Sequence, residues 1–265
     1  MQPTQPSVFY SVRTTISDVG AIVKRNLLRV RRSPQILVFS SIQPIMFLVL
    51  FNYVFGGAIG VATPGISYIN FLLPGIMAQS ALFGALQTPV ALVEDLDKGA
   101  IDRFRSLPMS RGAVLAGRTI ADGLRTTFTI VLMFVVGTLM GFRYQVGTSK
   151  FIAALLLVVA FSFAFSWVTA TLGLFIRNAE AVQTAGFLFV FPLTFASSAF
   201  VPVATMPGWL QTFARNQPVT QLINAMRALL LGGVAIDAVY ITIAWTVGIL
   251  AVFVPLAIWK FKRTV

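Results

Sequence analysis

The chain has 265 residues, of which 57% are hydrophobic and only 11% are charged, and its formal net charge is +12 at pH 7. It contains no cysteine and no histidine, which excludes disulfides, metal sites built from these residues and a histidine base. This composition is far from that of soluble proteins and, together with the apolar runs below, predicts an all-α polytopic membrane protein. The basic residues flank the apolar runs, so they indicate contact with anionic lipid and not with nucleic acid.

The N-terminal segment, residues 14–33, is predicted to form a helix that lies in the inner membrane interface. Its apolar residues recur at helical spacing, and its lysines and arginines fall on the other faces. Ser17 and Asp18 supply a helix start, and Pro34 supplies a stop. A solvated basic tail is the alternative.

Long apolar runs predict six membrane-spanning helices. From Ser33 to Val93 there is no charged side chain, and because one helical crossing takes about 20 apolar residues, this run holds two crossings. The six predicted spans cover residues 36–55, 68–92, 118–141, 151–176, 181–200 and 238–259. The prolines expected to kink or end these helices are Pro44, Pro74, Pro89 and Pro192.

The placement of lysine and arginine predicts the orientation of the spans. Basic residues are concentrated at 13–32, 98–111 and 260–263, on the same side as the N-terminus, and they are sparse on the other side. By the positive-inside rule, both termini are therefore cytoplasmic. The first span lacks a small-residue cleavage site, so we expect it to be retained as a helix and not removed as a signal peptide.

Residues 94–110, between the second and third spans, form a cytoplasmic loop that is predicted to contain a short helix. The carboxylates Glu94 and Asp95 come first and the arginines come late, an order that suits the helix dipole. Phe104 lies on the apolar face of this helix and is typical of a docking contact for a soluble partner. A helix that lies on the lipid headgroups is an equally compatible alternative.

Residues 202–233, before the last span, are predicted to form two helices on the outer side. Thr205 can cap a helix that begins at Pro207, and a second helix can begin at Pro218 and end at Gly232. The neutral run before this segment is longer than one crossing needs, so a re-entrant helical hairpin that enters the membrane from outside fits the length. A plain external amphipathic loop is the alternative.

Several kinds of chemistry are excluded or disfavoured. The sequence has no Gly-x-x-x-x-Gly-Lys-Ser/Thr phosphate loop and no cysteine or histidine for nucleophilic catalysis, so no catalytic residue and no metal site are predicted. Ion-driven carriers usually keep an ionisable residue near mid-membrane. Asp122 is the acid best placed to enter a span, and the spacing of Arg118 and Arg125 predicts an ion pair at the inner interface more than a proton carrier.

Amide and aromatic side chains within the spans are the candidates for a substrate path. Aromatic faces accept varied apolar shapes, and amides orient a ligand weakly. Most such groups in membrane helices hold neighbouring helices together, and residue type alone does not separate the two roles. The candidates are Gln43, Asn70, Gln79, Phe83, Phe191 and Phe195.

Two groups of residues carry a family resemblance. The first comprises Glu94, Gly99, Arg103, Leu107, Pro108, Ser110, Arg111, Gly117, Arg118, Asp122 and Arg125. The second comprises Met206, Pro207, Gly208, Trp209, Arg215, Asn216, Gln217, Pro218, Arg227, Ala228 and Leu229. In order and spacing they resemble the signature regions of ABC-2 type permeases, in the daunorubicin/doxorubicin-resistance branch found in actinobacteria.

This resemblance implies the permease subunit of an ATP-binding-cassette exporter, a single transmembrane domain over residues 1–265 in the bacterial cytoplasmic membrane. Such a permease pairs with a second permease, identical or related, and with two copies of a separate ATPase subunit. ATP and Mg²⁺ would be bound by that ATPase, so no cofactor is expected in this chain. The implied cargo is a drug, an antibiotic or a lipid. The residues implied to couple to the ATPase are Glu94, Asp95, Gly99, Ile101, Asp102, Arg103, Phe104, Arg105, Leu107 and Pro108.

Two other functions stay open on the sequence alone. One is a membrane-embedded scaffold or assembly subunit with no transport of its own. The other is an ion-gradient-driven carrier or pore, which the lack of acids in the middle of the spans disfavours.

Overall fold

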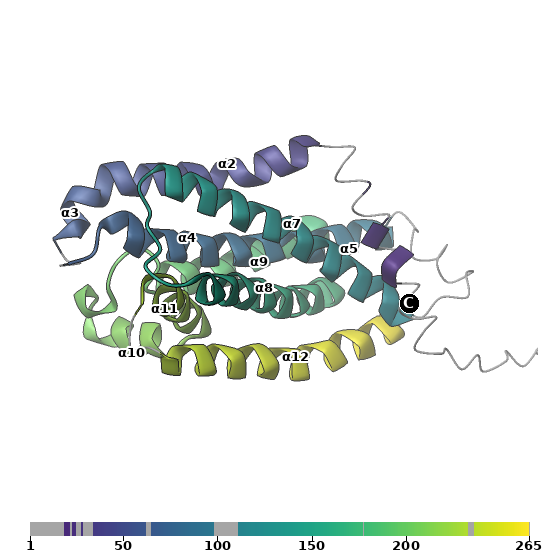
Figure 1. The fold of residues 1–265 in the computed structure, drawn as a ribbon. Helices are drawn as coiled ribbons and strands as arrows, with labels where there is room; N and C mark the ends of the chain where they lie inside the picture. The colour runs from purple at the N-terminus through teal and green to yellow at the C-terminus, as the bar shows by residue number, and fades with distance from the viewer. Residues whose placement is uncertain are drawn as a thin grey trace, which may run out of the picture.

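The computed structural model describes residues 34–61, 65–97, 111–176, 178–232 and 236–264, and also 19–21, 23–24 and 28. Within these ranges the regular structure is helical and no strand occurs. The long helices lie side by side in an elongated bundle (Figure 1). The prediction of an all-α membrane protein is thus confirmed for the described part of the chain.

The bundle is built from the following described elements. In chain order they are α2 (Pro34–Leu50), the π-helix η1 (Phe51–Phe55), α3 (Gly56–Gly60), α4 (Tyr68–Ala85), α5 (Gln87–Asp97), α7 (Arg111–Leu139), α8 (Thr148–Ile176), α9 (Ala179–Phe195), the 3-10 turn η2 (Val203–Thr205), α10 (Gly208–Asn216), α11 (Pro218–Leu231) and α12 (Ile236–Thr264).

Five helical stretches among the described residues are long and apolar enough to cross a membrane. They are Ser40–Gly60, Tyr68–Glu94, Ala116–Leu139, Thr148–Ile176 and Ile236–Phe261. The fifth predicted span falls on α9, a shorter apolar helix of 17 residues. At 1.5 Å per residue α9 is roughly 26 Å long, slightly less than a typical hydrocarbon core. A sixth crossing therefore stays a prediction.

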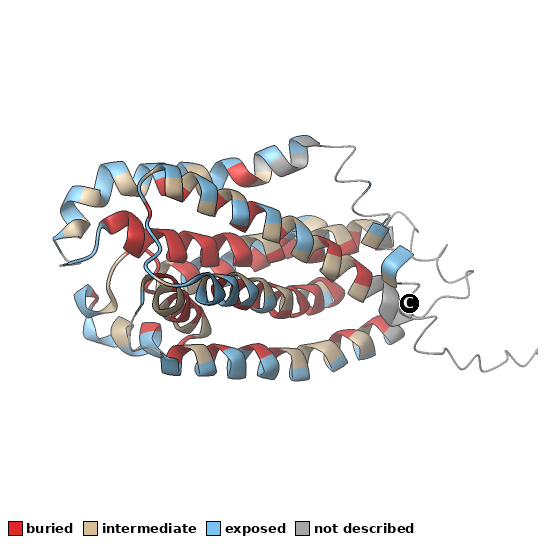
Figure 2. Ribbon diagram, viewed as in Figure 1, coloured by how far each residue is buried: buried red, intermediate tan, exposed pale blue. Residues whose placement is uncertain are grey.

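The helix α4 forms the centre of the bundle. Nearly all of its residues are buried, because it packs against α7, α8 and α11, while α2 and α12 lie at the periphery (Figure 2). Small residues permit the close approach of its neighbours. A Cβ atom at Gly75 would overlap the carbonyl group of Ala199, and one at Gly84 would lie 2.6 Å from Oγ1 of Thr126. Such contacts through small residues are typical of helices packed in membranes.

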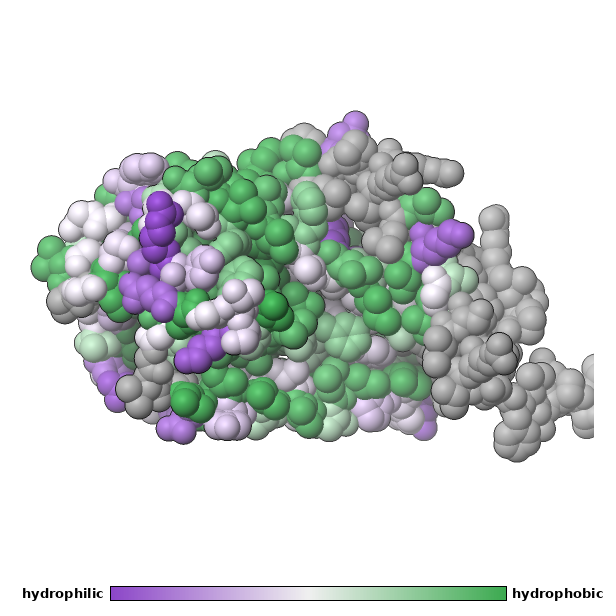
Figure 3. All heavy atoms as spheres, in the orientation of Figure 1, coloured by the Kyte–Doolittle hydropathy of each residue, from purple (hydrophilic) through white to green (hydrophobic). Residues whose placement is uncertain are grey.

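The outer surface of the bundle is largely apolar. On the face drawn in Figure 3, hydrophobic side chains cover the middle of the molecule, and hydrophilic ones gather toward the end that holds α3 and α10. Large hydrophobic side chains such as Leu139, Leu156 and Tyr240 are well exposed. In water this would favour aggregation, whereas in a bilayer these side chains face lipid tails.

Two predicted boundaries differ from the structure or lie partly outside it. Glu94 to Asp97 form the last turn of α5 and not the first turn of a separate helix, because no glycine or proline interrupts the chain before Gly99. Residues 98–110 lie outside the described residues. Of the predicted interfacial helix at 14–33, the described positions are helical and the others lie outside the description.

The segment before the last helix contains the two predicted short helices. α10 begins at Gly208 with Pro207 as its N-cap, and α11 has Pro218 in its first turn. The chain leaves α11 at Gly232, whose φ of +77° is a conformation that favours glycine. Thr205 was expected to cap α10, but its hydroxyl donates to the carbonyl oxygen of Pro202 within η2, at 2.8 Å. α11 packs against α4, α8 and α12.

Candidate functional site

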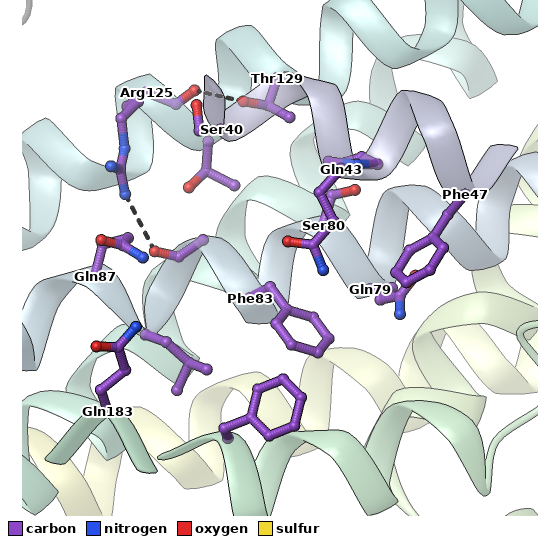
Figure 4. Close-up of a pocket in the computed structure, with 15 residues that line it drawn as sticks. Ser40, Gln43, Phe47, Gln79, Ser80, Phe83, Gln87, Arg125, Thr129 and Gln183 are labelled. Atoms are coloured by element: carbon purple, nitrogen blue, oxygen red, sulfur yellow. Dashed lines mark hydrogen bonds between the residues drawn. The ribbon is translucent and has the colours of Figure 1, made fainter. Parts of the chain in front are cut away.

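A cavity of about 270 Å³ lies between α2, α4, α5, α7 and α9. Among the described residues, its wall combines amide, aromatic and hydroxyl side chains with one charged side chain, Arg125 (Figure 4). The amides are Gln43, Gln79, Gln87 and Gln183, the aromatic rings are Phe47, Phe83 and Phe187, and the hydroxyls are Ser40, Ser80, Thr126 and Thr129. Such a mixture of apolar surface and a few polar groups is typical of ligand pockets.

The cavity lies beside an interruption between α4 and α5 at Leu86. Pro89 has no N–H, so the carbonyl oxygen of Ala85 lacks its intrahelical donor. The hydroxyl of Thr169 on α8 donates to that oxygen at 2.8 Å. One residue earlier, the carbonyl oxygen of Gly84 accepts from Nη2 of Arg125 at 3.3 Å (Figure 4). The expected effect of Pro89 is therefore seen, and partners from two other helices stabilise the break.

The prolines at 44, 74 and 192 were also expected to kink or end helices. Pro44 lies inside α2, Pro74 inside α4 and Pro192 inside α9, and each of these helices continues past its proline. None of the three ends its helix at that point.

The predicted ion pair forms on α7 beside the cavity. Asp122 lies 3.9 Å from Nε of Arg118 and 4.0 Å from Nη2 of Arg125, with all three side chains less than one fifth exposed. The hydroxyl of Thr88 on α5 donates to Oδ2 of Asp122 at 2.9 Å. Asp122 therefore connects α7 to α5, a link between residues 34 positions apart that local spacing could not predict.

Three of the six predicted path residues line this cavity, namely Gln43, Gln79 and Phe83. Asn70 does not, and its Oδ1 accepts a hydrogen bond of 3.0 Å from the backbone N–H of Arg143. It therefore joins α4 to the loop after α7, as most polar groups in membrane helices do.

The other two predicted path residues, Phe191 and Phe195, belong to a row of aromatic rings that leads away from the cavity. Neighbouring ring centroids along α9 are 5.2 Å apart for Phe187 and Phe191, and 4.2 Å apart for Phe191 and Phe195. The row continues through Phe200 to Phe51 of the π-helix, at 4.9 and 4.5 Å. It starts at Phe187 in the cavity wall and follows α9 toward the opposite end of the bundle.

A partly buried arginine at the far end of this row was not predicted as a site residue. Arg227 on α11 donates through Nε and Nη2 to the carbonyl oxygen of Phe71, at 3.0 and 2.8 Å, and through Nη2 to that of Ser198, at 2.6 Å. Its guanidinium group also lies 3.6 Å from the centroid of the Phe71 ring. The sequence signal was available, because Arg227 is the one charged residue in Pro218–Leu231.

The residues predicted to couple to an ATPase are described only at the start of their segment. Glu94 and Asp95 lie in the last turn of α5, which follows the cavity wall by two turns. Gly99, Ile101, Asp102, Arg103, Phe104, Arg105, Leu107 and Pro108 lie outside the described residues.

Comparison with known proteins identifies the family. Residues 17–231 match the ABC-2 type transporter family. The chain belongs to this family. The permease is 33% identical over 250 residues to the daunorubicin resistance ABC transporter permease protein DrrB1 of Streptomyces coeruleorubidus, a match that covers 94% of this chain and 88% of the relative.

Two other relatives of the permease show how widely the likeness extends. The probable doxorubicin resistance ABC transporter permease protein DrrC of Mycobacterium tuberculosis is 29% identical over 261 residues, with 97% of this chain and 94% of the relative covered. The putative transport permease ycf38 of Cyanophora paradoxa is 26% identical over 222 residues, with 81% and 74% covered. The family predicted from the sequence motifs is thus confirmed.

Proposed function

We propose that this permease is the transmembrane subunit of an exporter that moves a hydrophobic or amphipathic compound, such as a drug, an antibiotic or a lipid, out across the bacterial cytoplasmic membrane. A separate ATPase subunit supplies the energy. One observation carries the proposal. Helices α4 and α5 form part of the wall of the cavity of amide and aromatic side chains. This helix pair leads directly into the predicted coupling segment. The names of the drug-resistance relatives agree with such a role.

The position of the cavity suits uptake from the inner side. With both termini in the cytoplasm, the inner side of the bundle is the end at which α5 and α12 terminate (Figure 1). Gln43 lies near the start of the first span and Gln183 near the start of α9, so the cavity belongs to the half of the bundle nearer the cytoplasm. Cargo would therefore enter from the inner leaflet or the cytoplasm.

The cavity wall also supports pairing with a second permease, identical or related. Gln43, Gln87 and Gln183 line the cavity but remain exposed at the bundle surface. Amide groups that face lipid tails lose their hydrogen bonds with water, at a cost of roughly 2–7 kcal/mol for each unpaired group. A second permease packed against α2, α5 and α9 would cover these amides and complete the cavity.

The coupling route begins at the segment 94–110, which we propose docks into the ATPase. A movement of this segment would pass along α5 to Thr88 and through its hydrogen bond to Asp122. Arg125, which is paired with Asp122, contacts the carbonyl oxygen of Gly84 in the cavity wall. Closure of the ATPase would thus reach the wall of the cavity through contacts between α5 and α7.

Release on the outer side requires that the opposite end open. There Arg227 joins α11 to the start of α4 and to the turn after α9. We propose that α9 is the fifth of six crossings and that α10 and α11 form a re-entrant hairpin from the outside. In this arrangement the Arg227 contacts hold the outer end closed until ATP drives it open.

Co-purification with the ATPase tests the proposal. A cognate ATPase subunit co-expressed with the permease should purify with it. Phe104→Asp should release it, because a carboxylate would replace the predicted apolar docking contact. Phe104→Leu is the matched control and should retain the complex. If the complex and its ATP turnover survive Phe104→Asp, the coupling role is wrong. A stable complex that moves no cargo would instead favour a scaffold.

A further inference from the structure

The wall of the cavity contains an amide donor that lacks an acceptor. Gln79 is 3% exposed, and its Nε2 has no hydrogen-bond partner among the described residues. It lies near the middle of the stretch Tyr68–Glu94, at a depth where lipid offers no acceptor. Buried polar groups in native proteins are nearly always hydrogen-bonded. An unpaired donor in a cavity wall therefore indicates a ligand that supplies an acceptor.

The charge of the wall indicates which ligands are disfavoured. No carboxylate occurs among the described residues that line the cavity, whereas Arg125 does line it. The nearest acid on α7 is Asp122, which Arg118, Arg125 and Thr88 already contact. On α9, Glu180 lies in the first turn, about one turn before Gln183, and is not part of the wall. In a medium of low dielectric constant, such a wall repels an organic cation and accepts neutral or anionic groups.

The apolar part of the wall suits a flat or ring-bearing body. The rings of Phe83 and Phe187 pack edge to face with centroids 5.8 Å apart, and Phe47 lines the cavity from α2 (Figure 4). The cavity of about 270 Å³ is slightly smaller than the range of roughly 300–1,000 Å³ for ligand pockets. One copy of the permease therefore holds only part of a large amphiphile.

We propose that this cavity selects amphiphiles that carry no positive charge and that present a hydrogen-bond acceptor to Nε2 of Gln79. The proposal rests on the assignment of the cavity as the substrate site, and it narrows the substrate class. The acceptor is a carbonyl, ester, sulfonate or phosphate oxygen on an apolar body. Gln79 is the residue that sets this preference, and Arg125 extends it to anions.

A binding experiment on the permease alone tests this preference without any ATPase. The permease is placed in phosphatidylcholine nanodiscs, and empty nanodiscs are subtracted. Three fluorescent probes are titrated, namely Nile red (uncharged, with a carbonyl acceptor), 1-anilinonaphthalene-8-sulfonate (anionic) and rhodamine 6G (cationic). The wild-type permease should bind the first two at least about tenfold more tightly than the third, because a cation finds no counter-charge in the wall.

Variants at one position assign the preference to Gln79. Loss of one hydrogen bond in Gln79→Leu should weaken Nile red binding about five- to tenfold. Gln79→Glu, of nearly the same size, should shift the preference toward rhodamine 6G. Gln145→Leu is the control, because Gln145 is exposed and lies outside the cavity wall. Its affinities should match the wild type.

Three results would overturn the inference. They are tighter binding of rhodamine 6G than of the other two probes by the wild type, an unchanged Nile red affinity in Gln79→Leu, and no binding of either Nile red or the sulfonate above empty nanodiscs. The first of these comparisons needs no variant, so it holds even if a substitution impairs folding. Failure of the proposed export function would appear separately, as loss of ATPase coupling while the binding preference persists.

Discussion

The guanidinium group of Arg227 covers the ring of Phe71 and donates two hydrogen bonds to the carbonyl oxygen of the same residue. A single side chain on α11 thus holds the start of α4 by both its backbone and its side chain. A further bond to the carbonyl oxygen of Ser198 brings the turn after α9 into the same contact. These contacts make this end of the bundle depend on one partly buried cation.

Replacement of Arg227 tests that dependence. Arg227→Met keeps an apolar stem but leaves two buried carbonyl oxygens without this donor. Each unsatisfied oxygen should lower the free energy of unfolding by roughly 1–3 kcal/mol. We expect a marked fall in the thermal unfolding temperature of the purified permease. Arg227→Lys should have an intermediate effect, because it keeps the charge but loses the two-pronged geometry. Equal stability of the wild type and Arg227→Met would show that the contact contributes little.

The hydrogen bond from Thr88 to Asp122 should matter for coupling more than for assembly. Thr88→Val removes the hydroxyl with almost no change in shape, so the complex with the ATPase should still form. Permease-dependent ATP turnover should fall about tenfold or more, because a hydrogen bond to a charged group contributes roughly 1.5–3 kcal/mol. Thr127→Val on α7 is the control, because Thr127 donates only within its own helix, to the carbonyl oxygen of Gly123. A similar fall in both variants would contradict a specific role for Thr88.

Close packing between α4 and α7 beside the cavity gives a prediction about stability. In Gly84→Ala the added Cβ would lie 2.6 Å from Oγ1 of Thr126, so we expect a loss of about 1–3 kcal/mol from overpacking. Adding Thr126→Ala to the Gly84→Ala variant should restore most of the lost stability. At Gly123 on α7 a Cβ meets nothing within 4 Å, so Gly123→Ala should be neutral or slightly stabilising. Thermal unfolding in detergent measures all three, and tolerance of Gly84→Ala alone would contradict the packing.

The features that could be predicted from the sequence are those that depend on residues close together along the chain. The helical class and five long apolar helices follow from uncharged runs, and the pairing of Asp122 with Arg118 and Arg125 follows from helical spacing. The link from Thr88 to Asp122 was missed because it joins residues on different helices.

Among the predicted path residues, the distinction between Gln79 and Asn70 could not be predicted. Both lie on α4, which is buried on nearly every side, so its sequence has no polar face that would indicate a cavity. Gln79 lines the cavity, and Asn70 holds the loop at Arg143. Only the packing of the neighbouring helices separates their roles. For Arg227 the available signal was a lone charge on an otherwise uncharged helix. Arg227 was interpreted only as part of a family motif, so this signal was not used.

The central claim is that this permease moves cargo only when a nucleotide-hydrolysing partner drives it. The most direct measurement compares proteoliposomes that contain the permease alone with ones that also contain the ATPase, using 1-anilinonaphthalene-8-sulfonate and rhodamine 6G as probes. We predict that at least one of the two probes accumulates against its gradient in an ATP-dependent manner, and only when both proteins are present. This accumulation should be lost in the Phe104→Asp variant. Accumulation against the gradient by the permease alone would contradict the account.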